Sequence, residues 1–261
     1  MIHIDPSACI GCGLCVRDCP QKNLTVENGC CAVKREVCLG CGHCVAICPQ
    51  RAVSQDDSDM TTVEPVGFLV PPEDFLLQVK SRRSIRRFTE QKIAREVAEQ
   101  ILEAGRFTET AKNTQGVRYV FLQNELAAFK ALVWEGWRAW CEAKEAAGDP
   151  DGRRYMVYYR RYERDPADDR LFFNAPAALA VLSKHPVDGG LAAANIENMA
   201  VAMGLGVLFD GYVVEAIRQS PAALAFLNAG DTPVVAVLLL GYPAVSYTST
   251  APRRPVNVEW K

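Results

Sequence analysis

The sequence predicts an α+β protein with a small cysteine-rich domain in front of a larger domain. Three observations lead to this. Ten of the 11 cysteines lie within the first 50 residues, and eight of these form two runs of identical spacing. After residue 72, helical periodicity alternates with short apolar runs of strand length. Between the two lies a segment rich in acidic, Ser/Thr and proline residues, which is typical of a linker. We therefore expect domains at 1–53 and 73–261 joined by a linker at 54–72, whose apolar end, 66–70, lies along one of the domains.

The cysteine runs are an internal duplication. Each has the spacing C-x2-C-x2-C-x3-C followed by proline, and the second repeats the first at an offset of 29 residues. Thiolates at this spacing bind bacterial-type iron–sulfur clusters, in which the fourth cysteine of each run serves the other cluster. The sequence thus predicts two 4Fe-4S clusters, the first on Cys9, Cys12, Cys15 and Cys48 and the second on Cys38, Cys41, Cys44 and Cys19.

Neighbouring glycines support this interpretation, and the alternatives fit the spacing and the context less well. Gly11, Gly13, Gly40 and Gly42 let the backbone wrap closely and point amide donors at the sulfurs. The alternatives are a pair of zinc sites or a disulfide framework. A zinc site prefers four ligands in two separated pairs, and disulfides need an oxidising compartment that nothing in the sequence indicates.

The composition excludes several classes of function. The formal net charge is −2 and hydrophobic residues make up 49% of the chain, so we expect no nucleic-acid or membrane-surface partner. We see no signal peptide and no apolar run long enough to span a membrane. Because the thiols are committed to clusters, we expect the protein in the reducing cytoplasm.

The larger domain begins with helices and ends with a buried strand. Leu76, Leu77 and Val79 form the apolar side of its first helix, and Asp188 caps its last one, which ends near Gly204 and Gly206. We expect helices over residues 72–82, 94–106, 125–147 and 188–203, and strands over residues 117–122, 177–183 and 234–240. An aromatic-rich excursion from Trp134 to Tyr162 is either a lid over an active site or a structural helical hairpin.

An arginine-rich stretch, SRRSIRRF from Ser81 to Phe88, follows the first of these helices. Guanidinium groups bind phosphate through two parallel hydrogen bonds, and a serine hydroxyl adds a further donor. The stretch therefore suits one phosphate group. A charge run on a solvated face is the alternative that the residues alone leave open.

Several motifs in order resemble the nitroreductase family of FMN enzymes. They are SRRSIRRF, FTEQKI with the following helix, Asn113-Thr114-Gln115, DGGLAAANIENMAVAMGLG, Gly241-Tyr242-Pro243 and Pro252-Arg253-Arg254-Pro255. The resemblance covers residues 75–261, and the first part resembles a bacterial two-cluster ferredoxin. The nitroreductase resemblance implies a nitroreductase-like FMN domain with a central mixed sheet and surrounding helices. It also implies an obligate homodimer with FMN in the dimer interface.

The resemblance also implies roles for individual residues. Arg82, Arg83, Ser84 and Arg86 would hold the FMN phosphate and ribityl chain, with Arg253 closing on the same phosphate. Asn113 and Gln115 would lie beside the flavin from the partner subunit, and Asp210 and Gly211 near the isoalloxazine ring. The helix from Leu191 would be the central dimer helix, unless it is an ordinary core helix. The family usually has Pro-Ser-x-x-Asn-x-Gln-Pro-Trp where this chain has residues 109–117, ETAKNTQGV, so the flavin-side contacts depart from the pattern.

Other chemistry-bearing residues have simpler explanations. Cys30, Cys31 and Cys141 could form a third redox site, but spare cysteines are more often small apolar residues. His43 and His185 could relay protons, although supporting or surface roles are more common.

Together the two parts predict a redox enzyme. Clusters pass single electrons, whereas flavin stores two and can release them as a hydride, so no side-chain catalytic residue is expected. A small electron-carrier protein would feed the clusters, and FMN would reduce a nitroaromatic, quinone or activated alkene. The alternatives are a non-enzymatic electron carrier or redox sensor, or a flavoprotein fed by NAD(P)H with the clusters as outlet. The sequence leaves open the donor, the acceptor and the direction of electron flow.

Overall fold

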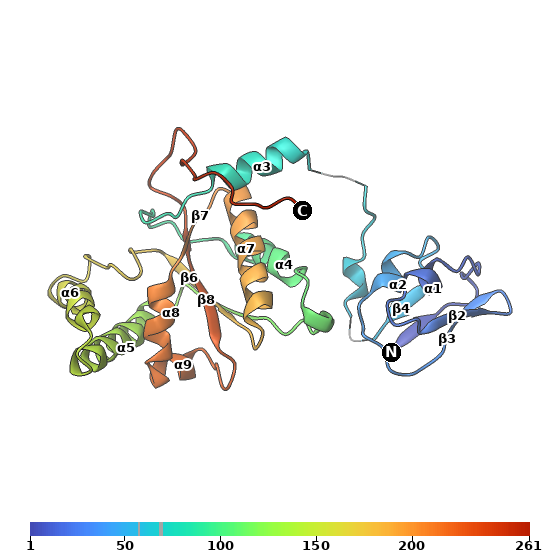
Figure 1. Ribbon diagram of the computed structural model, residues 1–261, viewed down its shortest axis with the longest axis horizontal. Coiled ribbons are helices and arrows are strands. Elements are labelled where there is room, and N and C mark those ends of the chain that lie inside the picture. Colours follow the sequence, from blue (N-terminus) through green and yellow to red (C-terminus); the bar gives the residue numbers. More distant parts are fainter. Residues whose placement is uncertain (57, 68–69) are drawn as a thin grey trace. The chain divides into compact units, whose positions relative to one another are not determined.

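The computed structural model describes residues 1–56, 58–67 and 70–261. The chain forms two compact units (Figure 1). Unit 1 consists of residues 1–69 together with 111–114, and unit 2 of residues 70–110 together with 115–261. Within the described ranges, no helix is both long and apolar enough to cross a membrane.

The backbone of unit 1 shows the same duplication as its sequence. Its two antiparallel ribbons pair β1 with β4 and β2 with β3. In the first ribbon Ile2 pairs with Gln55, and in the second Cys31 pairs with Val26. Cys31 lies 29 residues after Ile2 and Val26 lies 29 residues before Gln55, so the two registers correspond through the repeat. The elements are β1 (Ile2–Ile4), α1 (Leu14–Asp18), β2 (Leu24–Glu27), β3 (Cys30–Val33), α2 (His43–Ala46), β4 (Val53–Gln55) and the short turn η1 (Met60–Thr62).

Gly11 shows why the cysteine loops need glycine. Its φ is 64°, in the left-handed region, and a Cβ at this position would lie 2.3 Å from the carbonyl oxygen of Gly29. No other residue fits there without moving the β2–β3 turn, so this loop is closed by direct backbone contact.

Unit 2 is built on a four-stranded sheet in the order β5-β6-β8-β7. These neighbours pair antiparallel, and an isolated parallel bridge joins Ser84 to Val207 at the β7 edge, so the sheet has the mixed character expected from the resemblance. The strands are β5 (Arg118–Leu122), β6 (Ala177–Leu182), β7 (Gly206–Phe209) and β8 (Val234–Gly241).

Two hydrophobic cores cover the two faces of this sheet. Alternate residues of β6 enter each core, and all six of its residues are buried. One face packs against α4 (Arg95–Arg106) and α7 (Pro186–Ala202). The other packs against α5 (Leu126–Ala146), α8 (Gly211–Arg218) and α9 (Pro221–Phe226) (Figure 1). The α+β class expected from the sequence is confirmed.

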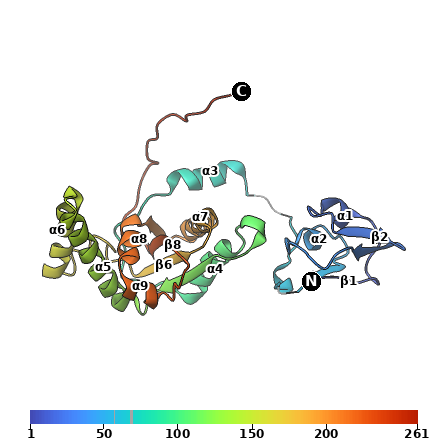
Figure 2. The ribbon, with the colours of Figure 1, turned by 60° about the horizontal axis from the view of Figure 1, so that its bottom comes forward.

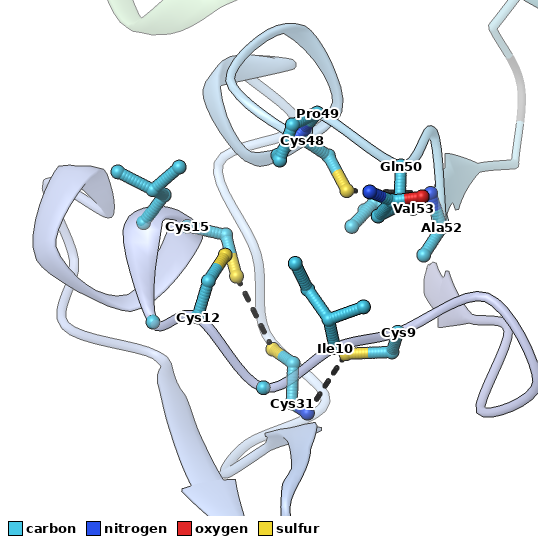
Figure 3. Close-up of a pocket in the computed structure, with 13 residues that line it drawn as sticks. Cys9, Ile10, Cys12, Cys15, Cys31, Cys48, Pro49, Gln50, Ala52 and Val53 are labelled. Carbon is cyan, nitrogen blue, oxygen red and sulfur yellow. Dashed lines mark hydrogen bonds between the residues drawn. The ribbon is translucent and has the colours of Figure 1, made fainter.

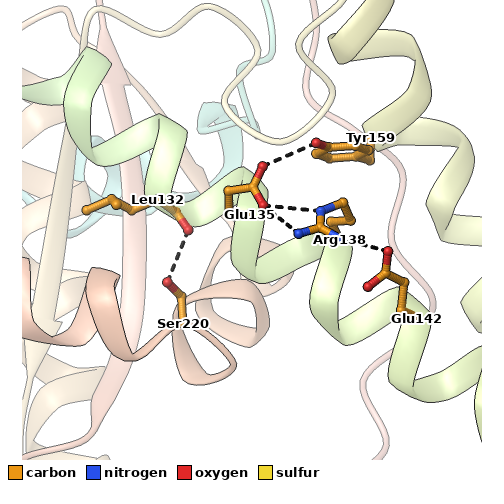
Figure 4. Close-up of polar contacts among 6 residues, drawn as sticks. All are labelled: Leu132, Glu135, Arg138, Glu142, Tyr159 and Ser220. Carbon is orange, nitrogen blue, oxygen red and sulfur yellow. Dashed lines mark hydrogen bonds and ion pairs between the residues drawn. The ribbon is translucent and has the colours of Figure 1, made fainter.

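The aromatic excursion is a helical hairpin of α5 and α6 (Pro150–Arg164). Trp134 and Trp137 are fully buried, and Trp134 stacks on Tyr162 with ring centroids 4.4 Å apart. The Ser220 hydroxyl donates to the Leu132 carbonyl at 3.1 Å, which joins α5 to the start of α9 (Figure 4). These contacts give the tryptophans a structural role.

Polar contacts on the exposed side of the hairpin add to this packing. Arg138 pairs with Glu135 and Glu142, and Tyr159 donates to Glu135 at 3.2 Å (Figure 4). Because such exposed pairs contribute little to stability, the buried aromatic rings, not these ions, hold α6 against α5.

The structure differs from the expected elements in three places. Helix α7 begins at Pro186 with His185 as its N-cap residue, so Asp188 lies in the first turn and the expectation that it caps the helix is wrong. The apolar side of α3 (Pro72–Ser81) is exposed. Strand β7 and helices α8 and α9 were not expected, because Gly204 and Gly206 suggested only a helix end, whereas Gly206 begins β7.

The expected linker is only partly covered by the structure. Val66 and Val70 are exposed, so these two residues do not pack on a domain as expected. Residues 57, 68 and 69, which belong to the same expected segment, lie outside the described residues.

We predict that Gly136→Ala destabilises unit 2. A Cβ on this α5 residue would lie 2.4 Å from the Ala216 carbonyl oxygen and 2.7 Å from the Ser220 Cβ. Overpacking of this kind costs about 1–3 kcal/mol of unfolding free energy, which urea denaturation followed by tryptophan fluorescence would measure. Gly190→Ala, also inside a helix but with nothing within 4 Å of the added Cβ, is the matched control. Equal stability of the two variants would contradict the close approach of α5 to α8.

Candidate cofactor sites

The first cavity in unit 1 collects one of the predicted cysteine quartets. Cys9, Cys12 and Cys15 reach it from the first run, and Cys48 reaches it from the end of the second (Figure 3). Pro49 and Val53 complete one wall. The four thiols that the spacing assigns to one cluster therefore surround a single space.

The second cavity collects the other quartet. Cys38, Cys41 and Cys44 come from the second run, and Cys19 comes from the first. His43 and Ile2 also line this space. Each cavity thus takes its fourth cysteine from the other repeat, which is the crossed arrangement expected from the spacing.

Backbone amides point at the sulfurs in both cavities. The N–H groups of Asn23 and Ala52, which correspond through the repeat, each donate at 3.3 Å, to Cys19 and Cys48 respectively. The Cys31 N–H donates to Cys9 Sγ at 3.4 Å. Such bonds stabilise thiolate, the form that binds metal.

The ionisation of the thiols follows from these surroundings. The pKa of Cys9 is lowered, mainly by the hydrogen bond from the Cys31 N–H. Burial instead raises the pKa of Cys44 to about 11, so metal binding there must displace a proton. Four thiols around one space, with amides directed at the sulfurs, are a donor set that fits an iron–sulfur cluster.

Cys30 and Cys31, which the sequence analysis set aside, lie beside the first cavity. Cys31 lines it, and its Sγ is 3.5 Å from that of Cys15. Burial raises the pKa of Cys31 to about 12. Cys141, in contrast, is fully buried in α5, and burial raises its pKa to about 11, as suits the small apolar residue that was expected.

The arginine-rich stretch follows α3 and runs beside β7. The Ile85 N–H donates to the Val207 carbonyl at 3.0 Å, which fixes this stretch against the sheet. Arg82 forms a 2.9 Å ion pair with Glu197 of α7, whose pKa is raised by burial against the opposing effect of Arg82. Arg83 lies over the Tyr247 ring at 5.5 Å.

A cavity of about 600 Å³ opens where β7 meets α8. It brings together Arg86, expected to hold the FMN phosphate and ribityl chain, with Asp210 and Gly211, expected near the isoalloxazine ring. Asp210 caps α8 by accepting from the N–H groups of Tyr212 at 3.0 Å and Val213 at 3.1 Å. Burial raises the pKa of Asp210 to about 6, although these bonds and the Arg86 charge act in the opposite direction.

Side chains of the hairpin and of the following loop also line this cavity. Tyr158 and Arg161 come from α6, and Arg170 and Phe173 from the loop before β6. The hairpin therefore borders the cavity while its tryptophans fill the core. Helical periodicity alone could not show which side of α6 faces it.

The remaining predicted residues lie elsewhere. Asn113 belongs to the turn η2 (Ala111–Asn113) within unit 1, where its side-chain amide donates to the Gly40 carbonyl at 2.7 Å. The Gln115 N–H donates to Thr110 Oγ1 at 2.9 Å. Arg253 is exposed in the C-terminal segment. Among the residues that the structure describes, the lining of the 600 Å³ cavity omits Arg82, Arg83, Ser84, Asn113, Gln115 and Arg253.

Solved structures share the fold of unit 2. A nitroreductase with bound FMN from Bacteroides fragilis NCTC 9343 is 18% identical with a TM-score of 0.56, and 71% of this chain and 98% of that chain are covered. One with bound FMN from Desulfitobacterium hafniense DCB-2 is 22% identical, with a TM-score of 0.55 and the same coverage. A BluB-like flavoprotein from Clostridium difficile 630 is 15% identical with a TM-score of 0.55, covering 73% and 100%.

Family models account for both parts of the sequence. No curated protein matches the chain. The 4Fe-4S dicluster domain model matches residues 1–49, and the nitroreductase family model matches residues 79–242, which is 164 of 261 residues. The chain therefore belongs to the nitroreductase family and carries a 4Fe-4S dicluster domain at its N-terminus.

Proposed function

We propose that the protein is an FMN-dependent oxidoreductase that passes electrons between two 4Fe-4S clusters and FMN and reduces a small organic acceptor. Nitroaromatics, quinones and activated alkenes are the acceptor classes. The observation that carries the proposal is the pair of cavities, each of which has one predicted cysteine quartet in its lining, on the same chain as a nitroreductase domain. The reduced thiols that clusters need are those of a reducing compartment such as the cytoplasm.

The first cluster would be held by Cys9, Cys12, Cys15 and Cys48, and the second by Cys19, Cys38, Cys41 and Cys44. The crossed lining of the cavities supports this division. Clusters carry one electron at a time. The chain contributes the thiolates, the amide donors to their sulfurs and the apolar walls that limit access of water.

FMN would be held by the arginine-rich stretch, with Arg82, Arg83, Ser84 and Arg86 on its phosphate and ribityl chain and Arg253 closing on the phosphate. Asp210, Gly211, Asn113 and Gln115 would lie near the ring. The shared cavity of Arg86 and Asp210 supports part of this assignment, as do the FMN-bound nitroreductases of the same fold. Bound FMN supplies the exchange between one-electron carriers and a two-electron acceptor.

An aromatic wall beside the charged residues favours an enzyme over a plain electron carrier. Tyr158, Phe173 and Tyr212 line the cavity together with Arg86 and Asp210. Flat organic molecules stack on such rings while the polar groups orient them. An electron carrier or redox sensor would need no cavity of this size. Either a small electron-carrier protein or NAD(P)H could serve as the donor.

Exposed apolar surface on unit 2 supports a homodimer. Phe75, Leu76 and Leu77 on α3 and Leu191 on α7 are exposed, and the Gln78 side chain joins the two helices by donating to the Asn198 carbonyl at 2.8 Å. Figure 2 shows the C-terminal segment leaving the body of unit 2, and Trp260 near its end is 91% exposed. Apolar surface of this kind marks an interaction site, so α7 and this segment would meet a second copy.

Anaerobic purification tests the proposal directly. We expect about eight irons with matching sulfide, four per cluster, and about one FMN per chain. Reduced ferredoxin should reduce the flavin faster than NADH or NADPH does, because the clusters accept single electrons. A protein without flavin would refute the proposal. Faster reduction by NADH or NADPH would indicate that electrons enter at the flavin and leave through the clusters.

Replacing Arg86 or Arg82 by alanine should release FMN without changing the iron content. Each charged hydrogen bond to the phosphate contributes about 1.5–3 kcal/mol, so FMN should bind roughly 10- to 150-fold more weakly. Equilibrium dialysis of FMN with parallel iron analysis measures both. Arg86→Ala is the sharper variant, because Arg82 also pairs with buried Glu197. Arg95→Ala, on the exposed side of α4, is the control. Unchanged FMN affinity in Arg86→Ala would overturn the phosphate assignment.

A further inference from the structure

The duplication allows the two cysteine cavities to be compared position by position. The offset of 29 residues maps Ile2 onto Cys31, and the strand registers agree with this mapping. Ile2 lines the second cavity and Cys31 lines the first. Both side chains are 6% exposed. At equivalent buried places, one cavity therefore has a thiol and the other a hydrocarbon.

Cys31 contacts two of the four cysteines around its cavity. Its N–H donates to Cys9 Sγ at 3.4 Å, and its Sγ lies 3.5 Å from Cys15 Sγ (Figure 3). A cysteine bound to iron is a thiolate and has no proton to donate. With Cys15 on iron, the proton between these two sulfurs can only come from Cys31. Ile2 has no side-chain donor to offer the second cavity.

We propose that Cys31 is a positioning residue that donates an S–H hydrogen bond to the Cys15 sulfur and makes the first cluster easier to reduce than the second. This rests on the proposed function, which supplies the clusters. Hydrogen bonds to the ligand sulfurs raise a cluster's reduction potential, because they stabilise the extra negative charge of the reduced form. The cluster takes up one electron, and Cys31 keeps its proton and exchanges no electron.

This difference in reduction potential would give electron transfer between the two clusters a direction. An electron that enters the dicluster domain would come to rest on the first cluster, whichever cluster receives it.

The test is an anaerobic redox titration of the full chain, followed by electron paramagnetic resonance, with iron counted in every sample. Cys31→Ile, which copies the second cavity, should lower the potential of one cluster and leave the other unchanged. We expect at least a threefold shift in electron partition between the clusters, about 28 mV for one electron. Cys31→Ala provides a second donor-free variant in case isoleucine overpacks the site.

Three further variants separate a hydrogen bond from simple packing. Cys31→Ser keeps a donor and should retain most of the wild-type potential. Ile2→Cys should raise the potential of the other cluster. Cys141→Ala removes a thiol buried in α5 and should change neither potential.

The outcomes distinguish this inference from the proposed function. Two clusters at full iron content with unchanged potentials in both donor-free variants would overturn the role of Cys31 and leave the proposed function intact. Loss of about four irons on replacing Cys31 would make it a ligand, which also overturns the role proposed here. Wild-type protein without two clusters would refute the proposed function itself.

Discussion

The structure of unit 1 depends on cysteine sulfurs from both repeats meeting around a common space. Neither repeat can complete a quartet alone, because the fourth cysteine of each run lies in the other run's cavity. The apolar core around these sulfurs is small, with Ile2, Leu24, Val45 and Val53 as its main members. Metal binding and folding would therefore be coupled in this unit, and the same sulfurs that would hold it together would carry its electrons.

Unit 2 meets a different requirement, since its sheet must be covered on both faces while one end stays open. Strand β6 is buried between the two cores, whereas the end of β7 leads into the cavity beside Asp210. The α5–α6 hairpin serves both needs, because Trp134 and Trp137 fill the core and Tyr158 lines the cavity. Charge and aromatic surface thus meet in one place, as binding a flat and polar molecule requires.

Features that depend on local sequence patterns could be predicted from the sequence better than features that depend on long-range packing. Cysteine spacing predicted which four cysteines share each cavity, because the pattern is encoded within a few residues and repeated. Periodicity predicted α4 and α5 nearly to the residue. Helices α8 and α9 were missed, although Asp210 and Ser220 are ordinary cap residues that could have indicated them. The exposed side of α3 and the cavity side of α6 depend on tertiary contacts. Cys31 was set aside because it lies outside the motif, yet the repeat already pairs it with Ile2.

Transfer of electrons between the clusters and the flavin of one chain is the central claim, and a single-turnover experiment tests it most directly. The protein is reduced anaerobically, mixed rapidly with a limiting nitroaromatic or quinone, and followed at flavin and cluster wavelengths. With two clusters and one FMN, each chain stores about four electrons. Cluster reoxidation should follow flavin reoxidation at a rate independent of protein concentration. Clusters that stay reduced after the flavin is oxidised, or that reoxidise at a rate proportional to protein concentration, would contradict transfer within the chain.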